Sequence, residues 1–144
     1  MISDHAIIVS QELKASREQI WKALTDKDEM RQWYFENIPD FEPVVGYTTA
    51  FPVVSGDKTF THLWEVLEVI PQERITYSWT FSEYEGYGKV TFVIQETEEG
   101  SSITVINEGL ETFPQDIPEF KPESCRGGWE YFVQGRLRIF LDGE

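Results

Sequence analysis

The sequence predicts an α+β fold in which a curved antiparallel β-sheet of about six or seven strands wraps around a long C-terminal helix. Three observations predict it. Segments of alternating apolar and polar residues follow one another through the middle of the chain, which favours consecutive antiparallel strands. Two short helical patterns follow the first of these segments, and a long helical pattern occupies residues 123–144. Only this last segment is long enough to cover the concave face of such a sheet.

The first strand is expected at residues 5–14, and two short helices follow it. Ser16 and Gln19 have the spacing of a capping box, in which the hydroxyl and the amide satisfy exposed backbone groups of the first helical turn. This pattern predicts a helix over about 17–25. Asp26 is placed to cap a second short helix in the same way.

Alternation predicts the remaining strands at residues 47–54, 60–70, 74–81, 89–97 and 102–110. The clearest case places Tyr77, Trp79 and Phe81 on one face, with threonine and serine on the other, which is typical of a sheet with one buried face. Residues 36–46 contain two prolines and predict an irregular segment or an edge strand. Residues 111–122 contain three prolines and are expected to cross the edge of the sheet.

The C-terminal helix carries an apolar stripe that is expected to face the sheet. The residues on or beside this stripe are Cys125, Trp129, Phe132, Val133, Arg136 and Phe140. Gly127 and Gly128 lower the helix propensity of the same segment. They indicate either a close contact between helix and sheet or the mouth of a cavity.

Composition excludes several classes of partner. The chain of 144 residues has a formal net charge of −14, which disfavours binding to nucleic acids and to anionic membranes. A single cysteine allows no internal disulfide. The N-terminal segment lacks the pattern of a signal peptide, and no stretch is long enough to be inserted in a membrane. We expect one domain over residues 1–144, located in the cytoplasm.

Three segments combine into a recognisable pattern. They are a helix pair ending in aromatic residues, ASREQIWKALTDKDEMRQWYF (Ala15–Phe35), a hairpin, HLWEVLEVIPQERITYSWTF (His62–Phe81), and a helix led by Gly-Trp, GGWEYFVQGRLRIFLDGE (Gly127–Glu144). Together they resemble the START-like (SRPBCC) superfamily, and more narrowly the family homologous to the activator of heat-shock protein 90 ATPase. The resemblance covers nearly the whole chain and implies the helix-grip fold. The superfamily includes lipid-transfer domains, polyketide cyclases, hydrophobic-ligand binders and co-chaperone domains, so the fold does not decide the function.

A helix gripped by a curved sheet leaves a tapering apolar space that can bind a ligand. Its expected lining consists of Trp64, Val66, Tyr77, Trp79, Phe92, Val105, Asn107, Cys125, Trp129, Phe132 and Val133. So many aromatic rings suit a planar or acyl ligand, although the same side chains can simply fill the core. Asn107 is polar within this apolar set. It either bonds to a ligand or caps nearby backbone groups.

Residues with catalytic or metal-binding potential are few. The two histidines, His5 and His62, form no metal-site spacing with cysteine or carboxylates, so neither a metal nor another cofactor is expected. Cys125, near the start of a helix, is either a thiol of lowered pKa or a buried inert one. Glu65 and Glu68 are candidate general bases if they point inward, and otherwise belong to a solvated strand face.

Three functions remain open. The first is binding of a small hydrophobic ligand, lipid-like or aromatic, without a cofactor. The second is a co-chaperone-like interaction with heat-shock protein 90, implied by the family resemblance and compatible with an acidic surface. The third is a cyclase or hydrolase activity in the same cavity, which a buried carboxylate or histidine facing the cavity would favour. No acid–base pair is evident, so catalysis is the less expected of the three.

Overall fold

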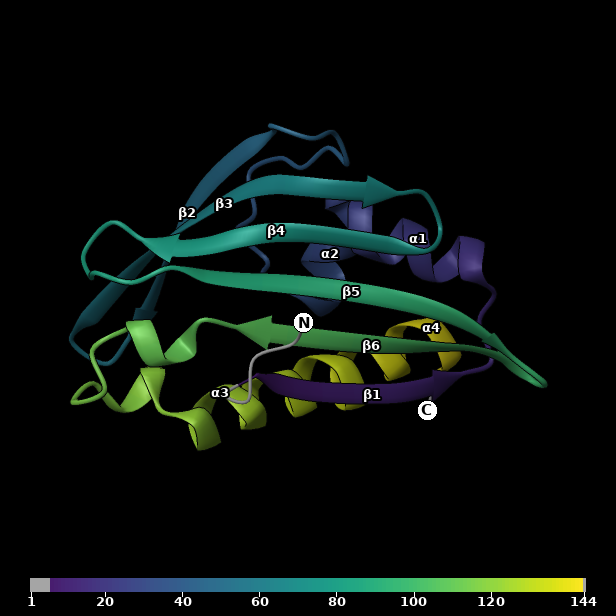
Figure 1. Ribbon diagram of the computed structural model, residues 1–144. Helices are drawn as coiled ribbons and strands as arrows, with labels where there is room; N and C mark the ends of the chain where they lie inside the picture. The colour runs from purple at the N-terminus through teal and green to yellow at the C-terminus, as the bar shows by residue number, and fades with distance from the viewer. Residues whose placement is uncertain (1–5, 144) are drawn as a thin grey trace.

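The computed structural model describes residues 6–143 and contains a six-stranded antiparallel sheet (Figure 1). The strands are β1 (Ile7–Leu13), β2 (Thr48–Ser55), β3 (Lys58–Ile70), β4 (Arg74–Phe81), β5 (Gly88–Thr97) and β6 (Gly100–Glu108), arranged in the order β1-β6-β5-β4-β3-β2. Strands β2 to β6 therefore pair with their neighbours in sequence, and β1 adds to the edge beside β6. Residues 36–46 form no strand, which agrees with the irregular alternative. Residue 5, where the first strand was predicted to begin, lies outside the described residues.

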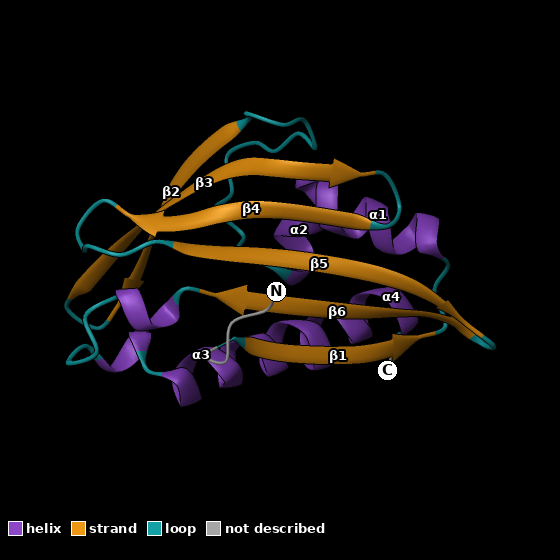
Figure 2. Ribbon diagram, in the orientation of Figure 1, coloured by secondary structure: helices purple, strands orange, loops and turns teal. Residues whose placement is uncertain are grey.

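The helices α1 (Arg17–Thr25) and α2 (Lys27–Trp33) lie on the same face of the sheet as the C-terminal helix (Figure 2). The predicted capping box is present: the Gln19 backbone N–H donates to the Ser16 hydroxyl at 3.2 Å, and the Ser16 N–H donates to the Gln19 side-chain oxygen at 2.9 Å. Asp26 caps α2 by accepting from the Glu29 N–H at 3.1 Å. Both helix starts are thus determined by adjacent residues.

The C-terminal helix is not uniformly α-helical. It consists of α3 (Pro122–Trp129), a π-helical segment, η3 (Glu130–Leu137), and α4 (Arg138–Asp142). A π turn is wider than an α turn, and Trp129, Val133 and Leu137, four residues apart, become the buried side. The predicted stripe is wrong at Phe140, which is 37% exposed, because it assumed the α-helical repeat throughout. Within residues 6–143 no helix combines the length and apolar character needed to cross a membrane.

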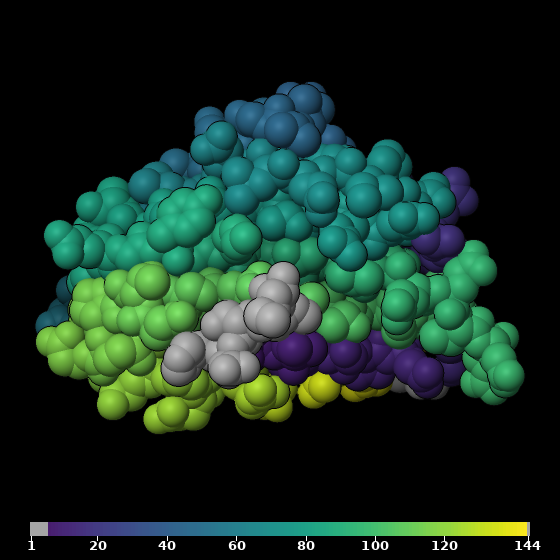
Figure 3. Space-filling model, in the orientation of Figure 1, coloured from purple at the N-terminus to yellow at the C-terminus, as the bar shows by residue number. Residues whose placement is uncertain are grey.

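Side chains of this helix hold it beneath the edge strand β1. The Arg126 guanidinium donates to the Ile8 carbonyl (3.3 Å), the Gln134 amide donates to the Ser10 carbonyl (3.0 Å), and the Asp142 carboxylate accepts from the Lys14 backbone N–H (2.9 Å). Edge strands otherwise present unpaired backbone groups. In the space-filling view the strands cover the helix, which is visible only as a yellow rim below β1 (Figure 3).

Aromatic residues of α2 fill the concave face near the middle of the sheet. Trp33 is fully buried, and its indole N–H donates to the Ala23 carbonyl at 2.7 Å. The Trp33 ring stacks on Tyr34 with centroids 4.5 Å apart, and the Tyr34 hydroxyl bonds to the Tyr77 hydroxyl of β4 at 2.7 Å. Burial raises the pKa of both tyrosines, so both hydroxyls stay protonated. This part of the core is therefore packed and hydrogen-bonded, with no space for a ligand.

Candidate functional site

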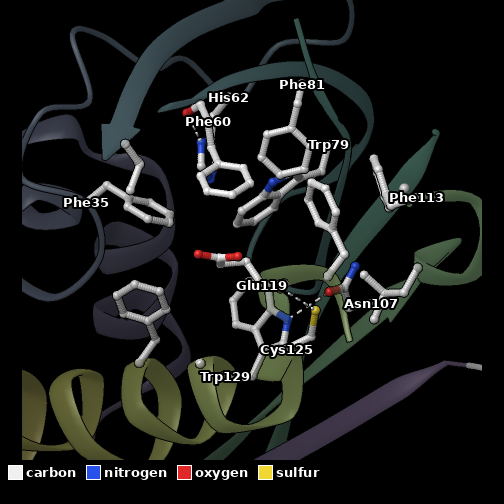
Figure 4. A pocket seen from close by; sticks show the side chains of 16 residues that line it. Phe35, Phe60, His62, Trp79, Phe81, Asn107, Phe113, Glu119, Cys125 and Trp129 are labelled. Atoms are coloured by element: carbon white, nitrogen blue, oxygen red, sulfur yellow. Dashed lines mark hydrogen bonds between the residues drawn. The ribbon is translucent and has the colours of Figure 1, made fainter. Parts of the chain in front are cut away.

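The other end of the concave face contains a cavity of about 220 Å³ that is partly open to solvent. Strands β3 and β4 form one wall, and α3 with the start of η3 forms the opposite wall (Figure 4). Aromatic rings make up most of the lining: Phe35, Phe60, Trp79, Phe81, Phe113, Phe120, Trp129 and Phe132. The space is therefore apolar over most of its surface, as ligand pockets generally are.

The proline-rich segment forms the end wall of this cavity. It contains two single-turn 3-10 helices, η1 (Leu110–Thr112) and η2 (Pro118–Phe120). The Phe113 and Phe120 rings stack with centroids 5.1 Å apart, and Phe120 also lies 5.2 Å from the ring of Phe81. Gly86 allows the Phe113 ring to lie close to its backbone, because a Cβ there would overlap the ring. The φ of +134° at Gly86 is also rare for other residues.

Five of the eleven predicted site residues line the cavity, namely Trp79, Asn107, Cys125, Trp129 and Phe132. The other six, which are at most 2% exposed, lie in the packed core outside the lining: Trp64, Val66, Tyr77, Phe92, Val105 and Val133. They share the inward-facing register, but rings at the end of α2 and directly after it occupy the space in front of several of them. Tyr34, for example, lies 5.4 Å from the Trp64 ring and 6.3 Å from the Phe92 ring.

Sequence reasoning missed more than half of the lining. The missed residues are Phe35, Val53, Phe60, His62, Phe81, Gly88, Leu110, Phe113, Glu119 and Phe120, whereas Gly128 was expected at a cavity mouth. Strand alternation contained a signal for some of them, because Phe60 and His62 share the inward register of Trp64, and Phe81 shares that of Trp79. No periodic signal existed for Phe113 and Phe120, which lie in irregular chain.

Asn107 positions a wall of the cavity. Its side-chain oxygen accepts a hydrogen bond from the Trp129 indole N–H at 3.0 Å, and its amide nitrogen donates to the Lys89 carbonyl at 3.2 Å. Of the two predicted roles, the structure shows the bond to nearby backbone. It adds a bond across to the C-terminal helix that fixes the Trp129 ring.

Cys125 is a partly buried thiol. Its Sγ lies 3.7 Å from the Glu119 carbonyl, to which it donates. Burial raises its pKa to about 11, so the thiol is protonated at neutral pH and is a poor nucleophile. The structure therefore supports the inert alternative. Glu65 and Glu68 are exposed on strand β3, which places them away from the cavity.

His62 is the one imidazole among the described residues, and it faces the cavity. Its side chain is buried, and Nδ1 lies 2.9 Å from the Phe60 carbonyl oxygen. Because a carbonyl can only accept, Nδ1 carries the proton and donates. Burial lowers the pKa of His62 to about 4, so the ring is neutral at neutral pH and Nε2 is a hydrogen-bond acceptor.

Glu119 brings a negative charge into the lining, and Figure 4 shows its carboxylate among the aromatic rings. One oxygen, Oε2, accepts from the Ser55 hydroxyl at 2.8 Å. The other, Oε1, lies 3.6 Å from the Lys58 ammonium and has no hydrogen-bond partner within the described part of the chain. The Ser55 hydrogen bond, with help from Lys58, lowers the pKa of Glu119, so the group is ionised at neutral pH.

The two helix glycines have open space around them. A Cβ built at Gly127 or Gly128 meets no atom within 4 Å, so the predicted close contact with the sheet is absent. Gly128 lines the cavity, and Gly127 is exposed on the outside of the helix. The alternative expectation, that the glycines lie at a cavity, holds for Gly128.

Comparison with known families agrees with this architecture. Residues 14–142 match the family described as "Activator of Hsp90 ATPase homolog 1-like protein". The chain belongs to this family. The match covers most of the chain and confirms the resemblance inferred from its three segments. A search of curated protein sequences gives no match.

Solved structures of similar proteins share the fold across their length. Protein CV1439 of Chromobacterium violaceum has a TM-score of 0.80 and 20% identity, over 99% of this chain and all of the other. Protein MLL2253 of Mesorhizobium loti has a TM-score of 0.76 and 24% identity, over 96% and 97% of the two chains. The Aha1 dimer of Colwellia psychrerythraea has a TM-score of 0.71 and 19% identity, over 94% and 95%. These similarities confirm the helix-grip architecture of the family.

Proposed function

We propose that this protein binds a small hydrophobic ligand, with aromatic character, in the cavity between the sheet and the C-terminal helix. The observation that carries the proposal is the cavity of about 220 Å³ with a mostly aromatic lining. A side chain large enough to fill it is missing at Gly128, where the helix faces the space. Family membership supports the proposal, since domains of this superfamily often bind hydrophobic ligands.

The volume limits the size of the ligand. An apolar cavity of about 150 Å³ holds a benzene molecule, whereas pockets for drug-sized ligands begin at about 300 Å³. A cavity of about 220 Å³ lies between these values. It suits a compact molecule of one or two rings better than a lipid with a long acyl chain.

The two helix glycines provide a matched test. Gly128→Leu would place an aliphatic side chain in the cavity, and Gly127→Leu would place the same side chain outside it. We expect Gly128→Leu to reduce the affinity for naphthalene-sized aromatics at least tenfold and Gly127→Leu to leave it unchanged, as measured by equilibrium dialysis. Equal affinities in the two variants would place the binding site elsewhere, and no binding by the wild-type chain would refute the function.

A second candidate is an interaction with heat-shock protein 90, which the family membership favours. The net charge of −14 gives the chain a surface suited to a basic partner. Adding the chain to a purified heat-shock protein 90 should then raise the rate of ATP hydrolysis. An unchanged rate, together with no co-purification of the two proteins, would remove this candidate.

We do not propose catalysis. His62 faces the cavity, but its pKa of about 4 makes it a weak base at neutral pH. Cys125 is protonated because burial raises its pKa to about 11. The Glu119 carboxylate has a lowered pKa because Ser55 donates to it, so it is a weaker base than an ordinary carboxylate. None of these three groups therefore has the protonation behaviour expected of a catalytic base or nucleophile.

A further inference from the structure

The polar groups that face the cavity divide into those with partners and those without. Asn107, Trp129 and Cys125 are hydrogen-bonded within the protein. Within the described residues, Nε2 of His62 and Oε1 of Glu119 have no hydrogen-bond partner. Both of these atoms are acceptors. An acceptor that faces the cavity without a partner gains a hydrogen bond when a ligand donates to it.

His62 is held in an orientation that leaves Nε2 available. The bond from Nδ1 to the Phe60 carbonyl fixes one side of the ring at 2.9 Å. The Phe51 ring stacks on it with centroids 5.1 Å apart, and Trp79 of the cavity wall lies 5.2 Å away. Because His62 is only 6% exposed, its imidazole cannot turn out into bulk solvent.

Glu119 sets the charge that the cavity tolerates. Its carboxylate is ionised, and the Lys58 ammonium at 3.6 Å is already paired with it. A ligand carboxylate in the cavity would lose its hydration, meet a like charge and find only an acceptor at His62. The indole N–H of Trp79, which also has no partner within the described residues, is an uncharged donor that a hydroxyl oxygen can accept from.

We propose that the cavity selects uncharged aromatic ligands that carry a hydroxyl group, which donates a hydrogen bond to Nε2 of His62, over the same ring system carrying a carboxylate. The proposal rests on the ligand-binding function above and adds the chemical class of the ligand. It follows from the acceptor at His62, the negative charge at Glu119 and a volume suited to one or two rings.

Three probes with one ring system test the proposal on the unmodified chain. They are naphthalene, 2-naphthol and 2-naphthoate, compared by equilibrium dialysis at neutral pH, where 2-naphthol is uncharged and 2-naphthoate is an anion. We expect 2-naphthol to bind roughly fivefold more tightly than naphthalene, the ratio that one net hydrogen bond supplies. We expect 2-naphthoate to bind more weakly than either.

Two variants assign the selectivity to the two residues. His62→Phe keeps an aromatic ring between Phe51 and Trp79 but removes the acceptor, so 2-naphthol should lose its advantage while naphthalene still binds. Naphthalene binding also shows that this variant retains a folded cavity. Glu119→Gln removes the charge and keeps an oxygen that can accept from Ser55. It should raise the affinity for 2-naphthoate and leave the ratio of 2-naphthol to naphthalene unchanged.

The outcomes separate this proposal from the function on which it rests. Equal binding of naphthalene and 2-naphthol would overturn the proposal while leaving aromatic-ligand binding in place. Tighter binding of 2-naphthoate than of 2-naphthol would overturn it as well, as would an undiminished preference for 2-naphthol in His62→Phe. If none of the three probes binds, the ligand-binding function fails, and the selectivity proposal fails with it.

Discussion

Two regions of the concave face use the same sheet and the same helix but pack differently. Near α2, Trp33 is fully buried and stacks on Tyr34 at 4.5 Å. Toward η1 and η2, Trp79 and Phe132 border a cavity of about 220 Å³. The first region is filled because Trp33, at the end of α2, and Tyr34, directly after it, pack large rings against the concave face. The second is closed by short 3-10 turns whose rings form a wall, so the space behind them stays open.

The comparison also separates two kinds of polar group. The hydroxyls of Tyr34 and Tyr77 bond to each other at 2.7 Å in the filled region. At the cavity, Nε2 of His62 and Oε1 of Glu119 have no such partner within the described residues. The division is not complete, because the Trp64 indole N–H in the packed region is also buried without a partner within the described residues. Trp64 does not line the cavity, however, so its N–H is not available to a ligand there, whereas a binding site can leave polar groups for its ligand.

The largest expected effect comes from truncating a tryptophan in each region. Trp33→Ala should lower the free energy of unfolding by about 3–5 kcal/mol, the usual cost of removing a large packed ring. Trp79→Ala should cost clearly less, because part of its surface already borders open space. Denaturant unfolding of both variants measures the difference. Equal losses would mean that the cavity end is packed as tightly as the rest.

The pH dependence of stability should report on His62. Its pKa is about 4 in the folded protein against 6.5 for an ordinary histidine. Between these values the unfolded chain holds a proton that the folded protein does not, so stability falls as the pH falls from 6.5 to 4. The full loss attributable to this group is about 3 kcal/mol.

The variant His62→Phe isolates this contribution. Both the wild type and the variant also lose stability as the pH falls because acidic groups such as Glu119 and Glu83, whose pKa values are lowered in the folded protein, take up protons. This part of the loss is common to the two proteins. Subtracting the two unfolding curves across this pH range leaves the histidine contribution. Parallel curves would show that His62 is better solvated than its burial indicates.

A smaller effect is expected at the bond that fixes the cavity wall. Asn107→Ala leaves the Trp129 indole N–H without its acceptor at 3.0 Å, which should lower the free energy of unfolding by about 1–3 kcal/mol. In a Trp129→Phe background, which lacks that N–H, the same change should cost about 1 kcal/mol less. Strict additivity in this double-mutant cycle would show that the bond does not stabilise the fold.

Local interactions made much of the fold predictable from the sequence. The helix starts at Ser16 and Asp26 depend on hydrogen bonds between residues three apart, so a short stretch of sequence is sufficient to identify them. The strands follow from alternation. Arg74–Phe81 matches its predicted range because one face is aromatic and the other carries threonine and serine. The inward position of Asn107 was visible for the same reason.

The location of the cavity was decided only by the tertiary structure. Alternation shows that Trp64 and Trp79 both face inward, but not that Tyr34 of a distant segment lies against Trp64. The end wall depends on Phe113 and Phe120, which lie in irregular chain without a periodic signal. Likewise, the wider turn of η3, rather than any local pattern, placed Leu137 in the core. The face on which a residue lies is a local property of its strand or helix. The position of a cavity depends instead on how all the surrounding segments pack, including those distant in the sequence.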